Sequence, residues 1–257
     1  MKLGKKPARR DAYKLNFADY VDTAAVLPKV PANFGHYPLI SSYGVLGNDF
    51  VGDCVIAGGL HEVMIWNAEQ AHAVPVSDTC AIENYTAITG YDPAQTDPQG
   101  NNPTDQGTDV QVAAQYRITH GLVDDAGVAH KVAAYVFVDP QNLAEVKAAC
   151  YLFGAIGLGL DFPDSAMTQF KHGQVWRPVA GARSLGGHYV TLAGWSRGDG
   201  VGITWGQRQL MTAAFIEEYA DEAIAYLSLE MLNRQQKSPE GFDVAALRAD
   251  LAQLEAK

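Results

Sequence analysis

A cysteine stands where a glycine-containing loop is followed by a helix-like run of residues. The loop is residues 48–54 (Asn-Asp-Phe-Val-Gly-Asp-Cys), and the expected helix runs from Val55 to about His72. The sulfur of Cys54 would face the positive end of the helix dipole and backbone N–H groups that lack a helical partner. Because this environment favours the thiolate, Cys54 is a candidate nucleophile. The alternative is a buried cysteine that only fills space.

A histidine is the candidate base for this thiol. His188 follows two glycines and begins an apolar, strand-like run that ends at Trp195. A cysteine nucleophile needs a group that takes its proton or forms an ion pair with it. The alternative is a core histidine at the start of a strand. The catalytic interpretation requires that Cys54 and His188 face one another in the folded chain.

Length and charge limit the classes of function. The chain has 257 residues, enough for one enzyme with two lobes, and 47% of them are hydrophobic. A net charge of -10 argues against a general nucleic-acid-binding surface, because phosphate contacts need Lys and Arg. The first ten residues differ, since they hold several basic residues and no acidic one. This basic arm is able to contact an acidic partner or nucleic acid, although a solvated tail is the simpler expectation.

Neither a signal peptide nor a transmembrane segment is expected, because no long apolar run is present. Cys54, Cys80 and Cys150 lack the paired short spacing of a disulfide framework or a zinc site. The glycines of residues 154–159 do not form a dinucleotide-binding motif. We therefore expect reduced thiols, no metal, no cofactor, and a cytoplasmic or virion-associated location.

The pattern of apolar residues changes from helical to strand-like along the chain. Helices are expected over residues 55–72, 78–90, 110–121, 142–151 and 211–221. Strands are expected over residues 132–138, 154–162, 175–179, 189–195, 200–205 and 222–228. This order predicts an α+β fold with two lobes. Gly58 and Gly59 lower the helix propensity of the first helix, which implies close packing against another element.

The two ends of the chain differ from the middle. Residues 1–26 are expected to form an N-terminal extension that includes the basic arm, and residues 27–228 the folded domain. Residues 229–257 are expected to be a polar linker and an amphipathic helix over 243–257, with leucines on one face. Both ends are candidate surfaces for protein partners.

Together these motifs resemble the papain-like cysteine peptidases. The loop 48–54 is similar to that family's Q-G-x-C-G-x-C-W sequence, with Gly52 and Cys54 in register. Residues 188–195 (His-Tyr-Val-Thr-Leu-Ala-Gly-Trp) are similar to H-A-V-x-x-V-G-Y, and residues 203–206 (Ile-Thr-Trp-Gly) to N-S-W-G. The separation of the cysteine from the histidine lies within the range of about 130–150 residues typical of the class.

The resemblance covers residues 27–228 and implies the papain-like two-lobe fold. The N-terminal lobe would be helical, with a long central helix after Cys54, and the C-terminal lobe an antiparallel sheet. Residues 104–107 (Thr-Asp-Gln-Gly) lie about where the family has the glycines that line its substrate cleft. With the Trp-Gly pair, they give a closer likeness to papain-like proteins encoded by phages or prophages.

Roles for individual residues follow from the resemblance. Cys54 would be the nucleophile, His188 the base, and Asn48 the side-chain donor of an oxyanion hole completed by the backbone N–H of Cys54. The substrate cleft would be lined by Gly52, Asp53, Gln106, Gly107, Gly187 and Trp205. Structural alternatives exist: Asn48 is also typical of a turn, Trp205 of core packing and Gln106 of a loop cap.

Two departures from the family pattern imply a degenerate triad. Ile203 stands where the family has the asparagine that orients the histidine, and strand alternation is expected to point Thr204 to the opposite face. Asp53 precedes the thiol directly, and its negative charge would oppose thiolate formation.

Two functions therefore stay open. The first is a papain-like thiol peptidase or amide hydrolase that acts on a peptide or protein through Cys54 and His188. The second is a catalytically weakened or inactive papain-fold protein that serves as a structural or binding component of a phage particle or other assembly. In the second case, partner proteins would bind residues 1–26 and 243–257. Neither function involves a membrane or, apart from the basic arm, nucleic acid.

Overall fold

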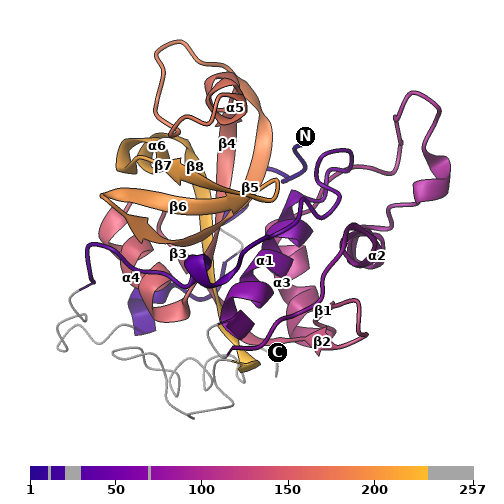
Figure 1. Cartoon of the computed structure of the whole chain (residues 1–257), viewed down its shortest axis with the longest axis horizontal. Coiled ribbons are helices and arrows are strands. Elements are labelled where there is room, and N and C mark those ends of the chain that lie inside the picture. Colours follow the sequence, from indigo (N-terminus) through magenta and orange to yellow (C-terminus); the bar gives the residue numbers. More distant parts are fainter. Residues whose placement is uncertain (11–12, 21–29, 69–70, 231–257) are drawn as a thin grey trace.

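A helical lobe and a sheet lobe meet along one central helix in the computed structural model (Figure 1). The structure describes residues 1–10, 13–20, 30–68 and 71–230. The linker and the C-terminal helix expected over 229–257 lie almost entirely outside the described residues. Within the described part, no helix has the length and apolar character needed to cross a bilayer.

The helical lobe is built around α1 (Cys54–Ala68), which is buried on nearly all sides. Such a helix belongs in the interior of a protein. Ser77 caps the next helix by accepting a backbone hydrogen bond from Cys80, and Asp109 caps the third in the same way. The remaining elements of this lobe are α2 (Asp78–Thr89), α3 (Val110–Thr119), β1 (Leu122–Val123), β2 (Ala129–His130) and the short 3-10 helices η3 (Tyr37–Leu39) and η4 (Pro93–Gln95). The 3-10 helix η2 (Phe17–Tyr20) instead packs into the core of the sheet lobe.

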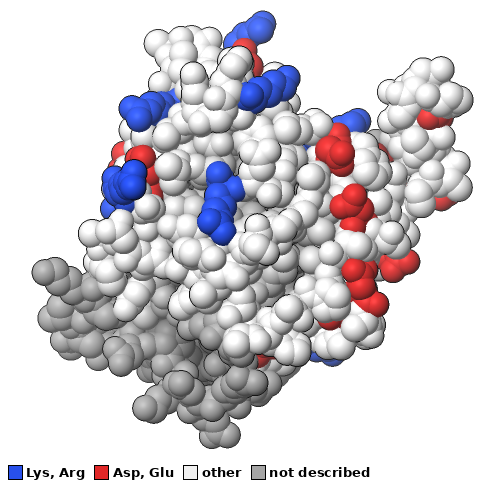
Figure 2. Space-filling model, in the orientation of Figure 1, with Lys and Arg blue, Asp and Glu red and all other residues white. Residues whose placement is uncertain are grey.

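The sheet lobe contains a six-stranded sheet in the order β3-β8-β4-β5-β6-β7, with antiparallel neighbours. Its elements are β3 (Val132–Val138), α4 (Leu143–Phe153), β4 (Ile156–Pro163), α5 (Asp164–Lys171), β5 (Ser184–Ser196), β6 (Asp199–Thr204), β7 (Gln207–Met211), α6 (Ala213–Tyr219) and β8 (Ala220–Ser228). On the face shown in Figure 2, acidic side chains gather over the helical lobe and basic ones over the sheet lobe.

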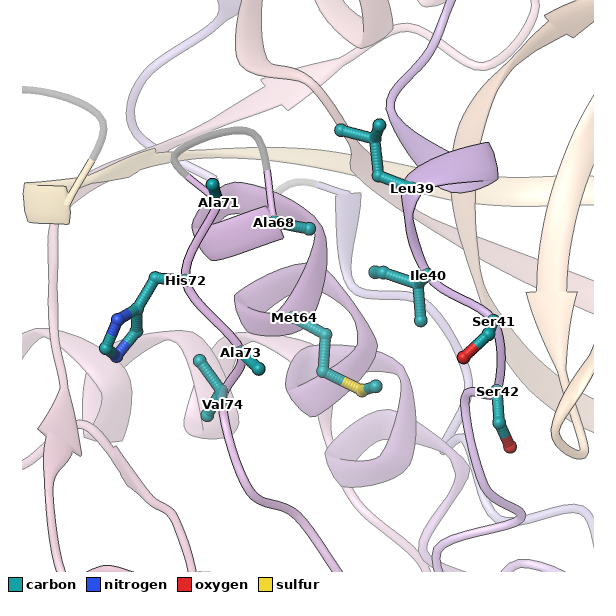
Figure 3. A pocket seen from close by; sticks show the side chains of 10 residues that line it. All are labelled: Leu39, Ile40, Ser41, Ser42, Met64, Ala68, Ala71, His72, Ala73 and Val74. Carbon is teal, nitrogen blue, oxygen red and sulfur yellow. The ribbon is translucent and has the colours of Figure 1, made fainter.

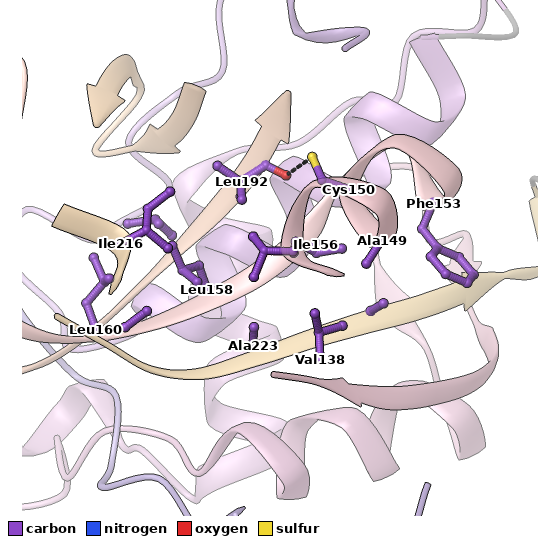
Figure 4. Close-up of a cluster of buried hydrophobic side chains, with 14 of the residues drawn as sticks. Val138, Ala149, Cys150, Phe153, Ile156, Leu158, Leu160, Leu192, Ile216 and Ala223 are labelled. Atoms are coloured by element: carbon purple, nitrogen blue, oxygen red, sulfur yellow. Dashed lines mark hydrogen bonds between the residues drawn. The ribbon is translucent and has the colours of Figure 1, made fainter. Parts of the chain in front are cut away.

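Aliphatic side chains from the sheet and from α4 form the core of the sheet lobe (Figure 4). Ile156, Leu158 and Leu192 are fully buried in it. Cys150 lies in the same cluster, and its thiol donates to the carbonyl oxygen of Leu192 at 3.3 Å. Cys150 is thus a packing residue of the core.

A polar network joins α1 to the sheet. Glu62 on α1 accepts hydrogen bonds from the Tyr189 hydroxyl at 2.8 Å and from the Arg117 guanidinium at 2.6 Å. Gly58 permits the close approach, because a Cβ there would lie 2.5 Å from the Tyr189 ring. The Thr191 hydroxyl donates to the Gly58 carbonyl at 2.7 Å. The close packing expected for this glycine is confirmed, and it holds the middle of β5 beside α1.

The expected helices and strands are present with one exception, and the two-residue strands β1 and β2 formed without having been predicted. The predicted strand 175–179 is wrong, because only an isolated bridge from Trp176 to Met211 forms there. Pro178 lacks the N–H that a strand would use. The helix α5 and the strand β7 were not predicted, since α5 is short and β7 is a polar strand at the edge of the sheet.

Candidate active site

Cys54 is the first residue of α1, as the loop-to-helix pattern indicated, and it is 1% exposed. Burial raises the pKa of the Cys54 thiol to about 12. The nearby backbones of Tyr189 and Gly4 and the charge of Lys5 oppose that rise. With the site closed in this way, the thiol keeps its proton.

His188 lies in β5 directly before Tyr189, whose backbone contacts the Cys54 sulfur. The start of α1 therefore lies beside β5 near His188, and the pairing of the thiol with the imidazole stays a prediction. His188 is fully buried, and burial lowers its pKa to about 3. Within the described part of the chain, its ring Nδ1 has no hydrogen-bond partner. That nitrogen is free to receive the proton of a nucleophile.

The other ring nitrogen of His188 has a definite partner. Its Nε2 lies 2.7 Å from the hydroxyl oxygen of Thr204. The Trp205 ring stacks on the imidazole with a centroid distance of 4.3 Å and an interplanar angle of 15°. Phe162 packs against both rings. If Nε2 carries the proton and donates it to Thr204, Nδ1 is the basic nitrogen.

The expectation that Thr204 points away from His188 is wrong, and the strand register explains why. Thr191 on β5 pairs with Ile203 on β6, so these two residues share a face of the sheet. His188 is an odd number of residues from Thr191, and Thr204 is next to Ile203. Alternation therefore puts His188 and Thr204 together on the opposite face. The Thr204 hydroxyl therefore lies beside the His188 imidazole. The resemblance to the family had implied that no side chain orients this histidine.

Asn48 and Asp53 are both buried in the loop before α1. The Asn48 amide donates to the Val51 carbonyl at 3.1 Å. Both carboxyl oxygens of Asp53 are buried without a hydrogen-bond partner among the described residues. Burial raises the pKa of Asp53 well above its usual value, which favours the neutral acid. The Asn48 amide thus binds an acceptor of its own loop, and its role as an oxyanion-hole donor stays a prediction.

The first six residues, here called the N-terminal segment, lie across this site. Lys5 N–H donates to the Gly187 carbonyl at 3.1 Å, and Lys6 N–H donates to the Thr108 carbonyl at 2.9 Å. Thr108 N–H in turn donates to the Gly4 carbonyl at 2.7 Å. The expected solvated tail is therefore wrong for these residues, and Lys5 is only 4% exposed.

Glycines make room for the N-terminal segment. A Cβ on Gly4 would lie 1.8 Å from the Gly52 carbonyl oxygen. A Cβ on Gly107 would lie 2.2 Å from the Gly4 carbonyl oxygen, and one on Gly187 would lie 2.2 Å from the Lys5 carbonyl oxygen. The structure thus brings three of the predicted cleft residues against one stretch of extended chain.

The loop that contains Gly107 is held by a side-chain network. Asp105 accepts from the Gly52 N–H at 3.1 Å and from the Tyr85 hydroxyl at 2.8 Å. The Tyr85 hydroxyl accepts from the Gly107 N–H at 2.9 Å. Gln106 is exposed, and its amide donates to a carbonyl of its own loop. Asp105 therefore couples this loop to the cysteine loop, whereas Gln106 faces away as a loop residue.

A cavity of about 430 Å³ lies elsewhere on the molecule (Figure 3). It is lined by residues of the last turns of α1, including Met64 and Ala68, and by residues 71–74 and 39–42. Since α1 begins at Cys54 and rises about 1.5 Å per residue, this cavity is roughly 20 Å from the thiol. It is separate from the candidate active site. Over the described ranges, no cluster of His, Cys, Asp and Glu is suited to a metal ion.

Comparison with known proteins supports the architecture. No protein-family model and no curated protein matches the sequence. The structure is similar to xylellain, a cysteine protease from Xylella fastidiosa, with 12% identity and a TM-score of 0.65 over 88% of this chain and 96% of that chain. It is also similar to procathepsin B S9 from Trypanosoma congolense, with 12% identity and a TM-score of 0.57 over 88% of this chain and 86% of that chain.

A third similar structure is the Carica candamarcensis cysteine protease CMS1MS2 in complex with E-64. It shares 10% identity and a TM-score of 0.52 over 77% of this chain and 99% of that chain. At these identities the likeness concerns the fold. The chain has the fold of the papain-like cysteine peptidases.

Proposed function

We propose that this chain is a thiol peptidase or amide hydrolase in which Cys54 is the nucleophile and His188 the base. The observation that carries this proposal is the position of Cys54 at the start of α1, against the backbone of the residue that follows His188. The Thr204 hydroxyl beside Nε2 of His188 adds to it, because Nδ1 is the basic nitrogen when Nε2 carries the proton and donates to that hydroxyl.

The reaction follows from these groups. The Cys54 thiol gives its proton to His188 Nδ1, and the thiolate attacks the carbonyl carbon of an amide bond, so that a C–S bond forms. The backbone N–H of Cys54 is a donor for the oxygen that becomes negative. The C–N bond then breaks, and the amine leaves with the proton from His188. Water hydrolyses the thioester to a carboxylic acid and restores the thiol.

The closed site is a resting state. With the N-terminal segment bound, burial raises the pKa of Cys54 and lowers that of His188, so both groups are held neutral. The carbonyl oxygen of Gly4 accepts from Thr108 N–H, so the peptide bond nearest the thiol has its oxygen engaged elsewhere. The segment therefore acts as an inhibitor of the site, and its departure hydrates both groups and reverses both shifts.

A substitution in the full chain tests the proposal. Gly4→Val places a side chain against the Gly52 carbonyl and expels the N-terminal segment. We expect this variant to hydrolyse fluorogenic peptides faster than the wild type, and Gly4→Val with Cys54→Ser to be inactive. Ala94→Val, which introduces a valine side chain at an exposed position, is the control. A Gly4→Val protein with native circular dichroism and no hydrolysis of a broad peptide library would contradict the proposal.

The second candidate function is a papain-fold component of a phage particle or other assembly. The filled site favours it, since Lys5 of the basic arm and the candidate nucleophile are both buried. In that case the wild type and Gly4→Val would be equally inactive, and deletion of residues 1–26 or 243–257 would abolish assembly. Phage origin and a virion or cytoplasmic location stay predictions from the sequence.

A further inference from the structure

The side chain of Lys5 enters a closed acidic pocket in the sheet lobe. Its ammonium nitrogen lies 2.9 Å from the Asp221 carboxylate and 3.7 Å from that of Glu222, and the side chain is 0% exposed. Glu222 is held in place by the Tyr13 hydroxyl, which donates to it at 2.6 Å. A buried lysine needs such partners, because an unpaired buried charge is strongly destabilising.

The pocket has room for a long side chain because β4 carries a glycine at this point. Gly159 pairs with Glu222 of β8, and a Cβ on Gly159 would lie 2.2 Å from Cε of Lys5. Any larger residue at position 159 would fill the space that the lysine stem occupies. The pocket is thus a slot beside Gly159 with two carboxylates at its end.

This slot belongs to the candidate active site. Gly4, the residue before Lys5, packs against the cysteine loop, since a Cβ on Gly4 would lie 1.8 Å from the Gly52 carbonyl oxygen. Lys5 N–H donates to the carbonyl of Gly187, the residue before His188. A side chain in the slot therefore belongs to a peptide that lies directly beside the thiol. The backbone groups that bind the N-terminal segment, on Gly187 and Thr108, are equally able to bind another extended peptide.

We propose that this slot selects a lysine or arginine side chain of the substrate once the N-terminal segment has left, an inference that rests on the proposed function. Removal of Lys5 would leave Asp221 and Glu222 in the slot without a cation. A lysine or arginine side chain of the substrate would replace the missing positive charge. Even with Lys5 bound, Asp221 Oδ1 is buried and has no hydrogen-bond partner among the described residues. The forked guanidinium of an arginine is suited to both oxygens of that carboxylate.

The test uses the full-length Gly4→Val protein and matched fluorogenic peptides. Within each set, the peptides differ at one position, which carries Lys, Arg, norleucine or Glu. A separate set is made for each position that flanks the cleaved bond. At one position we expect kcat/KM for Lys or Arg to exceed that for norleucine by about 10- to 100-fold, the scale of a hydrogen bond to a charged group. Glu at that position should give the slowest hydrolysis.

Variants of the slot identify its residues. Added to Gly4→Val, Asp221→Asn should reduce the ratio of kcat/KM for Lys over norleucine by about tenfold, because it removes one charge from the slot. Gly159→Ala should reduce the same ratio by narrowing the slot while both carboxylates remain. Glu217→Gln removes an exposed acidic residue from α6 and should leave the ratio unchanged. Hydrolysis without a basic preference, or a ratio unaffected by both slot variants, overturns the inference and leaves the proposed function intact.

A binding measurement separates the two proposals. If no peptide is hydrolysed, the proposed function fails, and the slot is tested by calorimetry on the Gly4→Val, Cys54→Ser protein. Tighter binding of the Lys peptide than of the norleucine peptide, weakened by Asp221→Asn, supports the slot as a basic-residue site. Equal binding of the two peptides, or binding of neither, overturns it.

Discussion

Two consecutive residues hold the imidazole of His188 in position. The Thr204 hydroxyl contacts Nε2, and the Trp205 indole covers the ring. Trp205 has a φ of 45°, in the left-handed region, so the chain turns directly after β6 and brings the indole back over His188. The tautomer and the orientation of the base therefore depend on the point at which β6 ends.

The Thr204 hydroxyl can be tested by its removal in the Gly4→Val protein. Thr204→Val keeps the shape of the side chain but removes the hydrogen bond to His188. Since a hydrogen bond to a charged group contributes about 1.5–3 kcal/mol, we expect kcat to fall by about 10- to 100-fold with a smaller change in KM. Thr204→Ser should restore most of the rate. An unchanged kcat for Thr204→Val would exclude Thr204 as a positioning residue.

At the residue scale, the features that depend on neighbouring residues in the chain could be predicted from the sequence. Cys54 at a loop-to-helix junction and His188 at the start of an apolar strand are visible in short stretches of sequence. Thr204 was missed because its direction depends on how β5 and β6 pair, which is a non-local property. The pKa shifts of Cys54 and His188 could not be predicted either, because the segments that bury these residues are distant in the sequence.

At the scale of elements, the position of the nucleophile relative to the base depends on α1 and β5. Glu62, Arg117 and Tyr189 join these elements in a buried hydrogen-bonded network, and Arg117 also lies 3.9 Å from the centre of the Tyr226 ring. The glycines of α1 revealed that something packs closely on it. The identity of that partner could not be predicted from the sequence, because the residues that contact Gly58 and Gly59 are distant along the chain.

The network gives a stability prediction. Glu62→Gln removes the charge that pairs with buried Arg117, so we expect the free energy of unfolding to fall by about 3–5 kcal/mol in urea titrations. Arg183→Ala breaks an ion pair whose arginine side chain is 86% exposed, and it should cost about 0–1 kcal/mol. Similar losses for both variants would contradict a structural role of the buried pair.

His61, also on α1, gives a prediction about pH. It is buried against Tyr43 and the Gly44 carbonyl, and burial lowers its pKa to about 4. Between about pH 6.5 and 4 the unfolded chain binds a proton at this histidine that the folded chain does not. Its presence therefore lowers the free energy of unfolding as pH falls through that window, by up to about 1.4 kcal/mol per pH unit.

Urea unfolding at pH 7 and pH 4.5 isolates this effect. His61→Gln should be less sensitive to the fall in pH than the wild type, whereas His172→Gln, at an exposed position, should match the wild type. Equal pH dependence in the wild type and His61→Gln would show that His61 is protonated in the folded state.

At the scale of the whole molecule, the N-terminal segment connects the two lobes. It contacts Gly52 and Gly107 on the helical side, and Gly187 and Asp221 on the sheet side (Figure 1). Its basic composition is typical of a solvated tail. Its docking could not be predicted, because it depends on contacts with residues that are distant in the sequence. The lobes, the central helix and the antiparallel sheet were nevertheless predictable, because periodicity and motif order define them locally.

The pairing of Cys54 with His188 beneath the segment is tested most directly by the pH dependence of Cys54 alkylation. Iodoacetamide modification is measured by mass spectrometry in Gly4→Val, with and without His188→Ala, and Cys80 and Cys150 serve as internal references. We predict that Cys54 reacts far faster than the other two thiols and stays reactive below about pH 8.5, the pKa of a free cysteine. His188→Ala should abolish that low-pH reactivity. Identical pH profiles with and without His188, or equal labelling of the three thiols, would contradict the pairing.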